Sequence, residues 1–77
     1  MGRFELYGTR HCPQTEEMRE WLEWLGVEFV EYDVESDFAA RDRMRNLTSG
    51  QRTVPVLVED GSVVQIGWQG RGCMVGE

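Results

Sequence analysis

The sequence predicts an α/β fold in which helices cover a four-stranded mixed sheet. Segments with the two-residue period of strands alternate with segments that have the 3.6-residue period of helices. This alternation is typical of a sheet covered by helices. The pair Asp60-Gly61 then separates two valine-rich runs, which is a strong hairpin signal. The expected order is therefore β-α-β-α-β-β, followed by a short or truncated C-terminal helix.

The first half of the chain supplies a strand, a helix and a second strand. Residues 3–7 alternate in polarity as a short strand does. A helix begins near Pro13, because proline suits the first helical turn, and ends at Gly26. Residues 27–34 are rich in β-branched and aromatic side chains and form a second strand parallel to the first. The buried face of the helix follows the spacing i, i+3, i+4 and i+7, at Met18, Trp21, Leu22 and Leu25.

The second half of the chain supplies a helix and a hairpin. Ser36 is the expected N-cap of the second helix. After a loop, residues 54–58 form the third strand and residues 63–66 the fourth. The tail at 67–77 holds four glycines, so at most a short final helix begins there. The buried stripe of the second helix is formed by Ala40, Met44 and Leu47.

Length and charge limit the function. The 77 residues are expected to form one small domain with a net charge of −6, and all eight cations are arginine. An acidic domain lacks the basic surface that nucleic acids and anionic membranes require, so neither is an expected partner. With no long apolar run and no apolar leader, the expected location is the cytoplasm. Two cysteines and one histidine are too few for a four-ligand zinc site or a disulfide-stapled scaffold.

The strongest candidate for chemistry is the tetrapeptide Cys-Pro-Gln-Thr at residues 12–15, between the first strand and the first helix. At a helix N-terminus, unpaired N–H groups and the helix dipole lower the pKa of Cys12 from about 8.5. The resulting thiolate is the form that attacks disulfides. Thr15 lies one turn further and can donate a hydrogen bond to the sulfur, while Arg10 and His11 add positive charge. The alternative is a buried cysteine that only fills space.

A second candidate is Thr53-Val54-Pro55, at the start of the third strand. Proline removes a hydrogen-bond donor from a strand expected in the middle of the sheet, so it needs a special reason. One reason is a cis peptide bond that turns the backbone toward a site, where an extended peptide can pair with the backbone before Pro55. The alternative is an ordinary proline at a strand start.

Together these features resemble the thioredoxin-like superfamily and, more closely, the glutaredoxins. The resemblance rests on Leu6-Tyr7-Gly8-Thr9, Cys12-Pro13-x-Thr15, Thr53-Val54-Pro55 and Gly67. Residues 19–24, 50–61 and 67–73 are also similar to the Uxx-star family, glutaredoxin-like proteins whose nucleophile position carries selenocysteine or cysteine. The resemblance implies that Cys12 is the nucleophile, with selenocysteine at this position in the native chain left open. It also implies that Pro55 is the cis-proline beside the nucleophile.

Departures from the glutaredoxin pattern concern the second cysteine and glutathione. Thr15 stands where the family usually has a second cysteine, so a disulfide within the motif is excluded. Thr9 replaces the lysine that binds a glutathione carboxylate. Residues 67–71 keep only the first glycine of the Gly-Gly-x-Asp-Asp segment that holds the glutathione amine. Glutathione is therefore an open question, and no cofactor is required.

Cys73 is the second cysteine of interest. In a glutaredoxin-like fold the segment after Gly67 passes near the active-site end. Cys73 is thus a candidate resolving thiol, provided that its Cα lies within about 7 Å of that of Cys12. The alternative is a tail cysteine without a role. Trp68, in the same segment, is a candidate wall of the site.

These observations predict a monomeric thiol-disulfide oxidoreductase with a monothiol-like motif. Its expected catalytic residues are Cys12, Thr15 and Cys73. Its expected substrate-binding residues are Arg10, Thr53, Val54, Pro55, Gly67 and Trp68, and no metal is expected. The Cys12 thiolate forms a mixed disulfide with a disulfide-containing protein or small-thiol substrate, and Cys73, glutathione or another small thiol resolves it. Two alternatives stay open: an iron–sulfur cluster or soft metal ion held by Cys12 of two subunits, and a redox-inactive adaptor.

Overall fold

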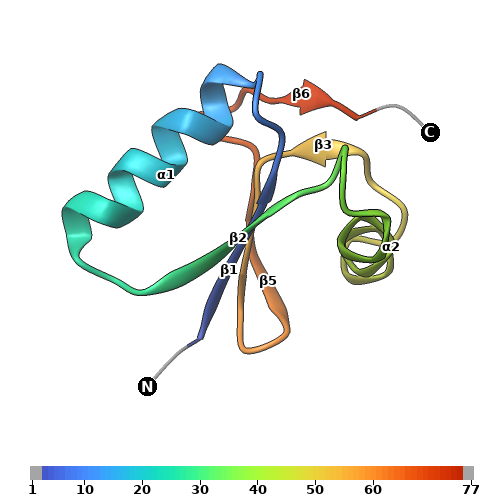
Figure 1. Ribbon diagram of the computed structural model, residues 1–77, viewed down its shortest axis with the longest axis horizontal. Coiled ribbons are helices and arrows are strands. Elements are labelled where there is room, and N and C mark those ends of the chain that lie inside the picture. The colour runs from blue at the N-terminus through green and yellow to red at the C-terminus, as the bar shows by residue number, and fades with distance from the viewer. Residues whose placement is uncertain (1–2, 76–77) are drawn as a thin grey trace.

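In the computed structural model, which describes residues 3–75, two helices lie on opposite sides of a mixed sheet (Figure 1). The sheet has the strand order β2-β1-β4-β5. Its β1 and β2 are parallel, whereas β4 is antiparallel to both β1 and β5. The four strands are β1 (Phe4–Gly8), β2 (Phe29–Asp33), β4 (Val56–Glu59) and β5 (Ser62–Ile66). This architecture confirms the predicted α/β fold with a four-stranded mixed sheet.

Helix α1 (Pro13–Leu25) covers one face of the sheet. Met18 and Leu22 are buried there with Leu6 and Leu57, as the spacing predicts. The prediction was wrong for two other residues of the stripe, because Trp21 is 38% exposed and Leu25 is 46% exposed. Trp21 lies at the border of the buried face, where the 3.6-residue period carries its side chain away from the sheet, and Leu25 is the last residue of the helix.

Helix α2 (Phe38–Leu47) covers the other face and begins one residue later than Ser36 predicts. The carboxylate of Asp37 accepts a hydrogen bond from the Ala40 N–H at 3.0 Å, so Asp37 is the N-cap. Ser36 lies in the turn before it, where its N–H donates to the carbonyl of Asp33 at 3.2 Å. Ala40 and Met44 are buried as expected, but Leu47 is partly exposed because it is the last helical residue.

The predicted third strand is divided at Pro55. The Val54–Pro55 peptide bond is cis, as expected from the sequence. Proline offers no N–H to a neighbouring strand, so the ladder stops there. Residues before it form the short strand β3 (Thr53–Val54), which leaves the main sheet, and residues after it continue as β4.

The tail forms a strand in place of the expected short helix. After β5 the chain turns at Gly67, and the backbones of Trp68 and Arg71 exchange two hydrogen bonds of 2.7 and 2.9 Å. Strand β6 (Cys73–Met74) follows and pairs antiparallel with β3. The glycines of this segment disfavour a helix, and pairing with β3 satisfies the backbone of β6 instead.

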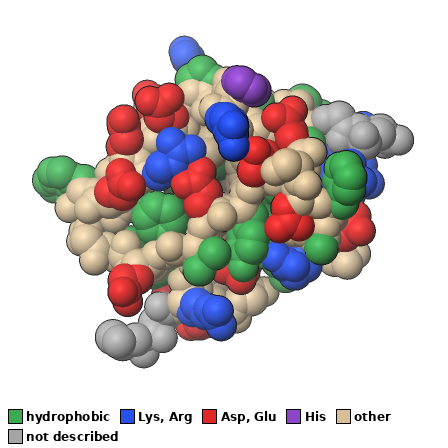
Figure 2. Space-filling view, viewed as in Figure 1, with side chains coloured by type: hydrophobic (Ala, Val, Ile, Leu, Met, Phe, Trp, Pro, Cys, Tyr) green, Lys and Arg blue, Asp and Glu red, His purple; other side chains and the backbone are tan. Residues whose placement is uncertain are grey.

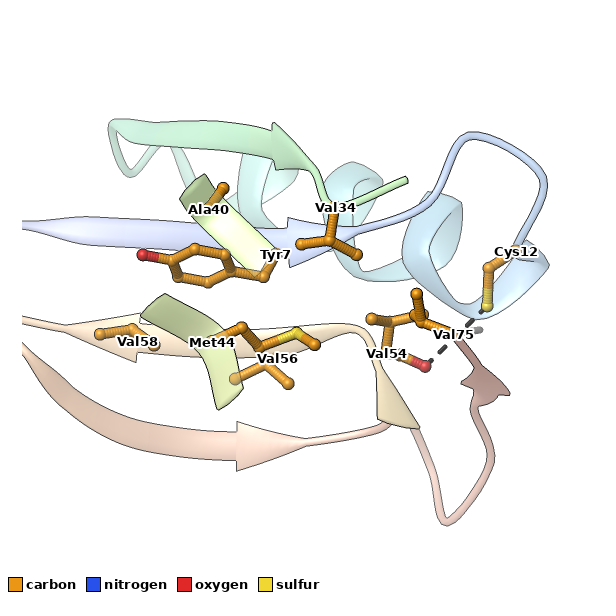
Figure 3. Packing of buried hydrophobic residues seen from close by; sticks show 9 residues of the cluster. All are labelled: Tyr7, Cys12, Val34, Ala40, Met44, Val54, Val56, Val58 and Val75. Carbon is orange, nitrogen blue, oxygen red and sulfur yellow. Dashed lines mark hydrogen bonds between the residues drawn. The ribbon is translucent and has the colours of Figure 1, made fainter. Parts of the chain in front are cut away.

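The core has one cluster on each side of the sheet. The cluster facing α1 consists of Leu6, Met18, Leu22 and Leu57. The cluster facing α2, drawn in Figure 3, consists of Tyr7, Cys12, Val34, Ala40, Met44, Val54, Val56, Val58 and Val75. This second cluster runs from the middle of the sheet to its end beside β3, so Cys12 and Val75 close one end of the core.

The hydroxyl of Tyr7 is a polar group at the edge of the α2-side cluster. It donates to the Glu5 carboxylate at 3.0 Å and accepts from Arg43 Nε at 3.4 Å. Burial raises the pKa of Tyr7 above its ordinary value of 10.0, and the hydrogen bond from Arg43 opposes this shift.

The surface mixes charges of both signs. Figure 2 shows acidic side chains interspersed with arginines on the face viewed. One arginine, Arg19 of α1, binds Glu31 of β2 through two hydrogen bonds of 2.6 Å and so ties the helix to the edge of the sheet. Among residues 3–75, neither helix has the length and apolar character needed to cross a bilayer.

Candidate active site

Cys12 lies where β1 gives way to α1. It is the N-cap of the helix, with extended backbone angles of φ −91° and ψ 116°. Its N–H donates to the Thr9 carbonyl at 3.4 Å, and its carbonyl accepts from the Glu16 N–H at 3.2 Å. The side chain is 2% exposed. When it is reduced, its sulfur faces the positive end of the helix dipole, which favours a thiolate.

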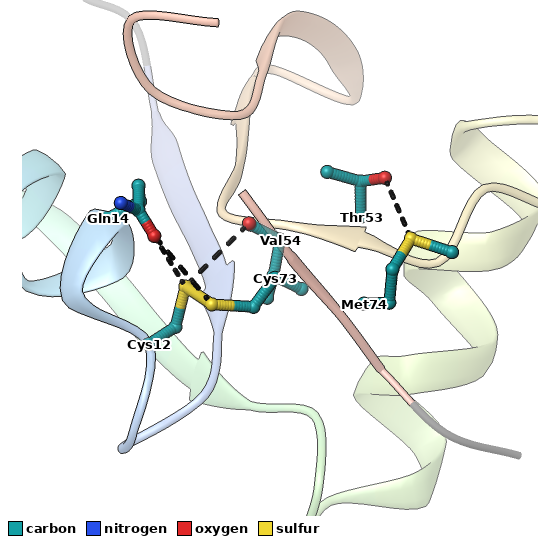
Figure 4. The surroundings of a disulfide bond; sticks show 6 residues. All are labelled: Cys12, Gln14, Thr53, Val54, Cys73 and Met74. Carbon is teal, nitrogen blue, oxygen red and sulfur yellow. Dashed lines mark hydrogen bonds between the residues drawn. A yellow bond between two sulfur atoms is a disulfide. The ribbon is translucent and has the colours of Figure 1, made fainter. Parts of the chain in front are cut away.

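Cys12 is joined to Cys73 by a disulfide (Figure 4). Their Cα atoms are 6.0 Å apart although the residues are 61 positions apart in the chain. The distance is within the limit that a disulfide allows, so the expected approach of Cys73 to Cys12 is confirmed. Neither cysteine is free in the described structure.

Strand pairing presents Cys73 to Cys12. In the β3–β6 register, Val54 is opposite Cys73 and Thr53 is opposite Met74. One step further, the Val75 N–H donates to the Arg52 carbonyl at 2.8 Å. The Val54 carbonyl oxygen lies 4.0 Å from Cys12 Sγ. A dashed line in Figure 4 marks this contact. The structure thus brings Val54 next to both cysteines, with Thr53 and Pro55 on either side of it in the chain.

Gln14 touches both sulfurs and was missed by the sequence analysis. Its Oε1 lies 3.6 Å from Cys12 Sγ and 3.7 Å from Cys73 Sγ (Figure 4). In the reduced chain this oxygen can accept a hydrogen bond from either thiol. Helical side chains lean toward the N-terminus of their helix, so a long polar residue in the first turn after Cys12 was the signal available.

The Thr15 hydroxyl makes no hydrogen bond to the Cys12 sulfur, which differs from the prediction made from the sequence. Its side chain is fully buried, and within residues 3–75 its hydroxyl oxygen has no hydrogen-bond partner. It points instead at β1, where a Cβ on Gly8 would overlap its Cγ2 and lie 2.7 Å from its Oγ1. Thr15 therefore packs the start of α1 against the end of β1.

Arg10 lines an open polar cavity of about 220 Å³ beside the Cys12 loop. The other lining residues are Gly8, Thr9, Arg19, Glu31 and Asp33, so neither cysteine borders the cavity. Arginine and carboxylate groups both face this space, and Glu31 is already held by Arg19. Arg10 is thus placed next to the Cys12 loop but on the α1 side of the sheet edge.

Gly67 and Trp68 hold the turn that aims the tail at Cys12. The Gly67 N–H donates to the Pro55 carbonyl at 2.7 Å, and its φ is 83°. A Cβ on Gly67 would lie 2.8 Å from the Arg71 carbonyl oxygen, so both space and conformation require glycine here. Trp68 packs on the α1-side core, with its ring 5.4 Å from that of Trp21.

The described side chains offer no ready metal site. Among residues 3–75, no three His, Cys, Asp or Glu side chains gather closely enough to hold an ion. The dominant feature at this end of the sheet is the cysteine pair, which is suited to two-electron exchange between a disulfide and two thiols.

Comparisons with known proteins agree with this chemistry. The sequence profile of the Glutaredoxin family matches residues 4–64. The chain belongs to the glutaredoxin family. Among glutaredoxin-like relatives, an uncharacterized 8.6 kDa protein in the rubredoxin operon of Clostridium pasteurianum is 35% identical over 60 residues, covering 78% of this chain and 79% of the relative. A probable glutaredoxin of Synechocystis is 36% identical over 63 residues, which are 80% of this chain but 58% of that protein.

Solved structures support the same glutaredoxin-like fold. The thioredoxin-like protein BC3987 superposes with a TM-score of 0.77 at 35% identity, covering 86% of this chain and 88% of that one. A glutaredoxin from Archaeoglobus fulgidus superposes with a TM-score of 0.76 at 22% identity, over 90% of this chain and 78% of its own. The family and the Cys12–Cys73 disulfide together support a thiol-disulfide redox role.

Proposed function

We propose that this chain is a thiol-disulfide oxidoreductase that cycles between a Cys12–Cys73 disulfide and the corresponding dithiol. The observation that carries the proposal is the placement of Cys73 on β6, opposite Val54 and bonded to the helix N-cap Cys12. A cysteine outside the Cys-Pro-Gln-Thr motif thereby acts as the resolving cysteine, which glutaredoxins usually have at the position of Thr15. Among the family's mechanisms this is a two-cysteine cycle built on a monothiol-like motif.

The cycle begins with the reduced chain. The Cys12 thiolate attacks one sulfur of a substrate disulfide, a new S–S bond forms, and the other substrate sulfur leaves as a thiolate with the bonding electron pair. The Cys73 thiolate then attacks Cys12 Sγ, forms the internal disulfide and releases the second substrate sulfur. Two electrons have passed from the dithiol to the substrate. Two molecules of a small thiol, which become joined in a disulfide, or one reduced dithiol protein then restore the chain.

The helix N-terminus assists both directions of this exchange. It stabilises the Cys12 thiolate, which makes Cys12 a nucleophile at neutral pH and a good leaving group when the internal disulfide is reduced. Gln14 lies against both sulfurs, and its Oε1 can accept a hydrogen bond from the thiol of either cysteine. Glutathione is an alternative to Cys73 as the resolving thiol. A contact between Arg10 and an anionic substrate stays a prediction, because the cavity that Arg10 lines borders neither cysteine.

Mass spectrometry after mild oxidation with oxidised glutathione tests the proposal. The native chain should lose two hydrogens and give a peptide in which Cys12 is linked to Cys73. The Cys73→Ser variant should instead accumulate glutathione on Cys12, whereas Cys12→Ser should catalyse no disulfide reduction. Retained turnover in Cys12→Ser would contradict the proposed nucleophile. The two-cysteine cycle would be contradicted if Cys73→Ser turned over as fast as the native chain and the native chain formed no internal disulfide.

A further inference from the structure

We propose that the β3 edge selects substrate segments of the form glycine, cysteine, any residue, aliphatic residue. The tail residues 72–75 have this form and occupy the edge in the oxidised chain. The inference rests on the proposed function and names the substrate class of the same site. The substrate is a protein segment that can become extended and whose cysteine is in a disulfide.

The place of the substrate cysteine follows from the place of Cys73. Cys73 reaches Cys12 because it is opposite Val54 in the antiparallel β3–β6 pair. The carbonyl of Val54 lies 4.0 Å from Cys12 Sγ, so this position of β3 is the one beside the nucleophile. A substrate cysteine that pairs with β3 must take the same register to exchange its sulfur with Cys12.

The residue before the cysteine has no room for a side chain. A Cβ at Gly72 would lie 2.6 Å from the carbonyl oxygen of Val54 and 2.7 Å from Cγ2 of Thr53. The nearer atom belongs to the backbone of β3 and cannot rotate away. Gly72 is not among the glycines with positive φ, so the requirement concerns space and not backbone conformation. A substrate segment in this register meets the same obstacle and needs glycine at the same place.

The two residues after the cysteine differ in burial. Met74 is 73% exposed, and the 3.5 Å hydrogen bond that its sulfur accepts from the Thr53 hydroxyl lies at the surface, so this position accepts many kinds of side chain. Val75 is 6% exposed and belongs to the core cluster that contains Val54 and Cys12, as Figure 3 shows. When the tail leaves, the space of Val75 is open to an aliphatic side chain of similar size, and a polar side chain would be desolvated there.

The tail and the substrate therefore compete for one edge. Reduction of the Cys12–Cys73 bond releases the tail, the substrate segment pairs with β3, and the Cys12 thiolate attacks its cysteine sulfur while the substrate's other sulfur leaves as a thiolate. Cys73 then attacks Cys12 Sγ, the substrate thiolate leaves, and renewed pairing of β6 with β3 displaces the reduced segment.

The test uses the full chain carrying Cys73→Ser and peptides with the sequence of residues 71–75, Arg-Gly-Cys-Met-Val. Each peptide cysteine carries 5-thio-2-nitrobenzoate, whose release is followed by absorbance. Three altered peptides replace glycine by alanine, methionine by alanine, or valine by serine. The methionine change is the matched control and should leave the rate unchanged. The glycine and valine changes should each slow mixed-disulfide formation roughly tenfold or more.

The outcomes separate this inference from the proposed function. Equal rates for all four peptides overturn the selection of the segment but leave Cys12 as a nucleophile. If the peptide with the methionine change reacts as slowly as the other two altered peptides, the proposed pairing register with β3 is wrong. If Cys12 reacts neither with the peptides nor with a small activated disulfide, the proposed function fails and the inference fails with it.

Discussion

Gly72→Ala is the substitution that best measures how the tail is held. The new Cβ would start 2.6 Å from the Val54 carbonyl oxygen, whereas ordinary contacts begin at 3.4 Å, so β6 would have to move outward by about 0.8 Å. Overpacking of this kind typically costs about 1–3 kcal/mol. In the reduced chain the tail is not bonded and can move away, so most of the cost falls on the disulfide form.

The cost appears as a change in reduction potential. For a two-electron couple, 30 mV corresponds to about 1.4 kcal/mol, so the midpoint potential of the Cys12–Cys73 pair should rise by about 20–60 mV in Gly72→Ala. The chain is equilibrated with defined ratios of reduced and oxidised dithiothreitol, free thiols are alkylated, and the two forms are counted by mass spectrometry.

The control for this measurement is Met74→Ala. Met74 lies in β6, two residues after Gly72, but is 73% exposed, so its replacement should move the potential by less than about 10 mV. If Gly72→Ala has the same potential as the native chain, the carbonyl of Val54 does not exclude a side chain at this position, and the reasoning about the tail is refuted.

Three further predictions concern packing and titration. Gly8→Ala should lower the free energy of unfolding of the oxidised chain by about 1–3 kcal/mol in denaturant titrations, because the new Cβ overlaps the Thr15 side chain. The loss should be smaller when Thr15 is also replaced by alanine. Fully additive losses would contradict the contact between the two residues. Thr15→Val should leave this free energy unchanged or raise it by up to about 1 kcal/mol, because the hydroxyl is buried without a partner in the described structure. Thr15→Val should also leave the pH dependence of Cys12 alkylation unchanged. A raised pKa of Cys12 in this variant would instead support the hydrogen bond from Thr15 to the sulfur that the sequence predicts. Burial raises the pKa of Tyr7 in the folded chain, so the stability tied to its protonated form is complete below about pH 10 and is lost as the pH rises through the folded pKa. Tyr7→Phe should reduce this loss when the free energy of unfolding is measured between about pH 9 and 11. Equal losses in both chains would contradict a raised pKa of Tyr7.

Element order could be predicted because periodicity and turn chemistry agree with the final fold. The Asp60-Gly61 hairpin and the helix stop at Gly26 are local signals that no distant contact opposes. The N-cap of α2 was misplaced by one residue because Ser36 and Asp37 both have side chains suited to capping. The direction in which the chain leaves β2 decides which of the two residues caps the helix, and this direction cannot be read from the sequence.

The site residues divide in the same way. Cys12 and Pro55 stand at the ends of elements, where their chemistry can be recognised without coordinates. Helical spacing alone suggested a hydrogen bond from Thr15 to Cys12, but the Thr15 side chain is buried against Gly8 of β1, and its hydroxyl has no partner among the described residues. Strand β6 has no periodic pattern in two residues, and only the pairing with β3 and the bond to Cys12 define it.

The bond between residues 61 positions apart also affects the denatured chain. An unfolded chain that is closed into so large a ring has fewer conformations than an open one, and the chain-entropy picture values this loss at about 4 kcal/mol. A small domain has a total stability of about 5–15 kcal/mol. Each turnover of the substrate would thus alternate the chain between a more durable ring and a more fragile open form. Proteolysis in the cell should fall mainly on copies that have just been reduced and have not yet met a substrate.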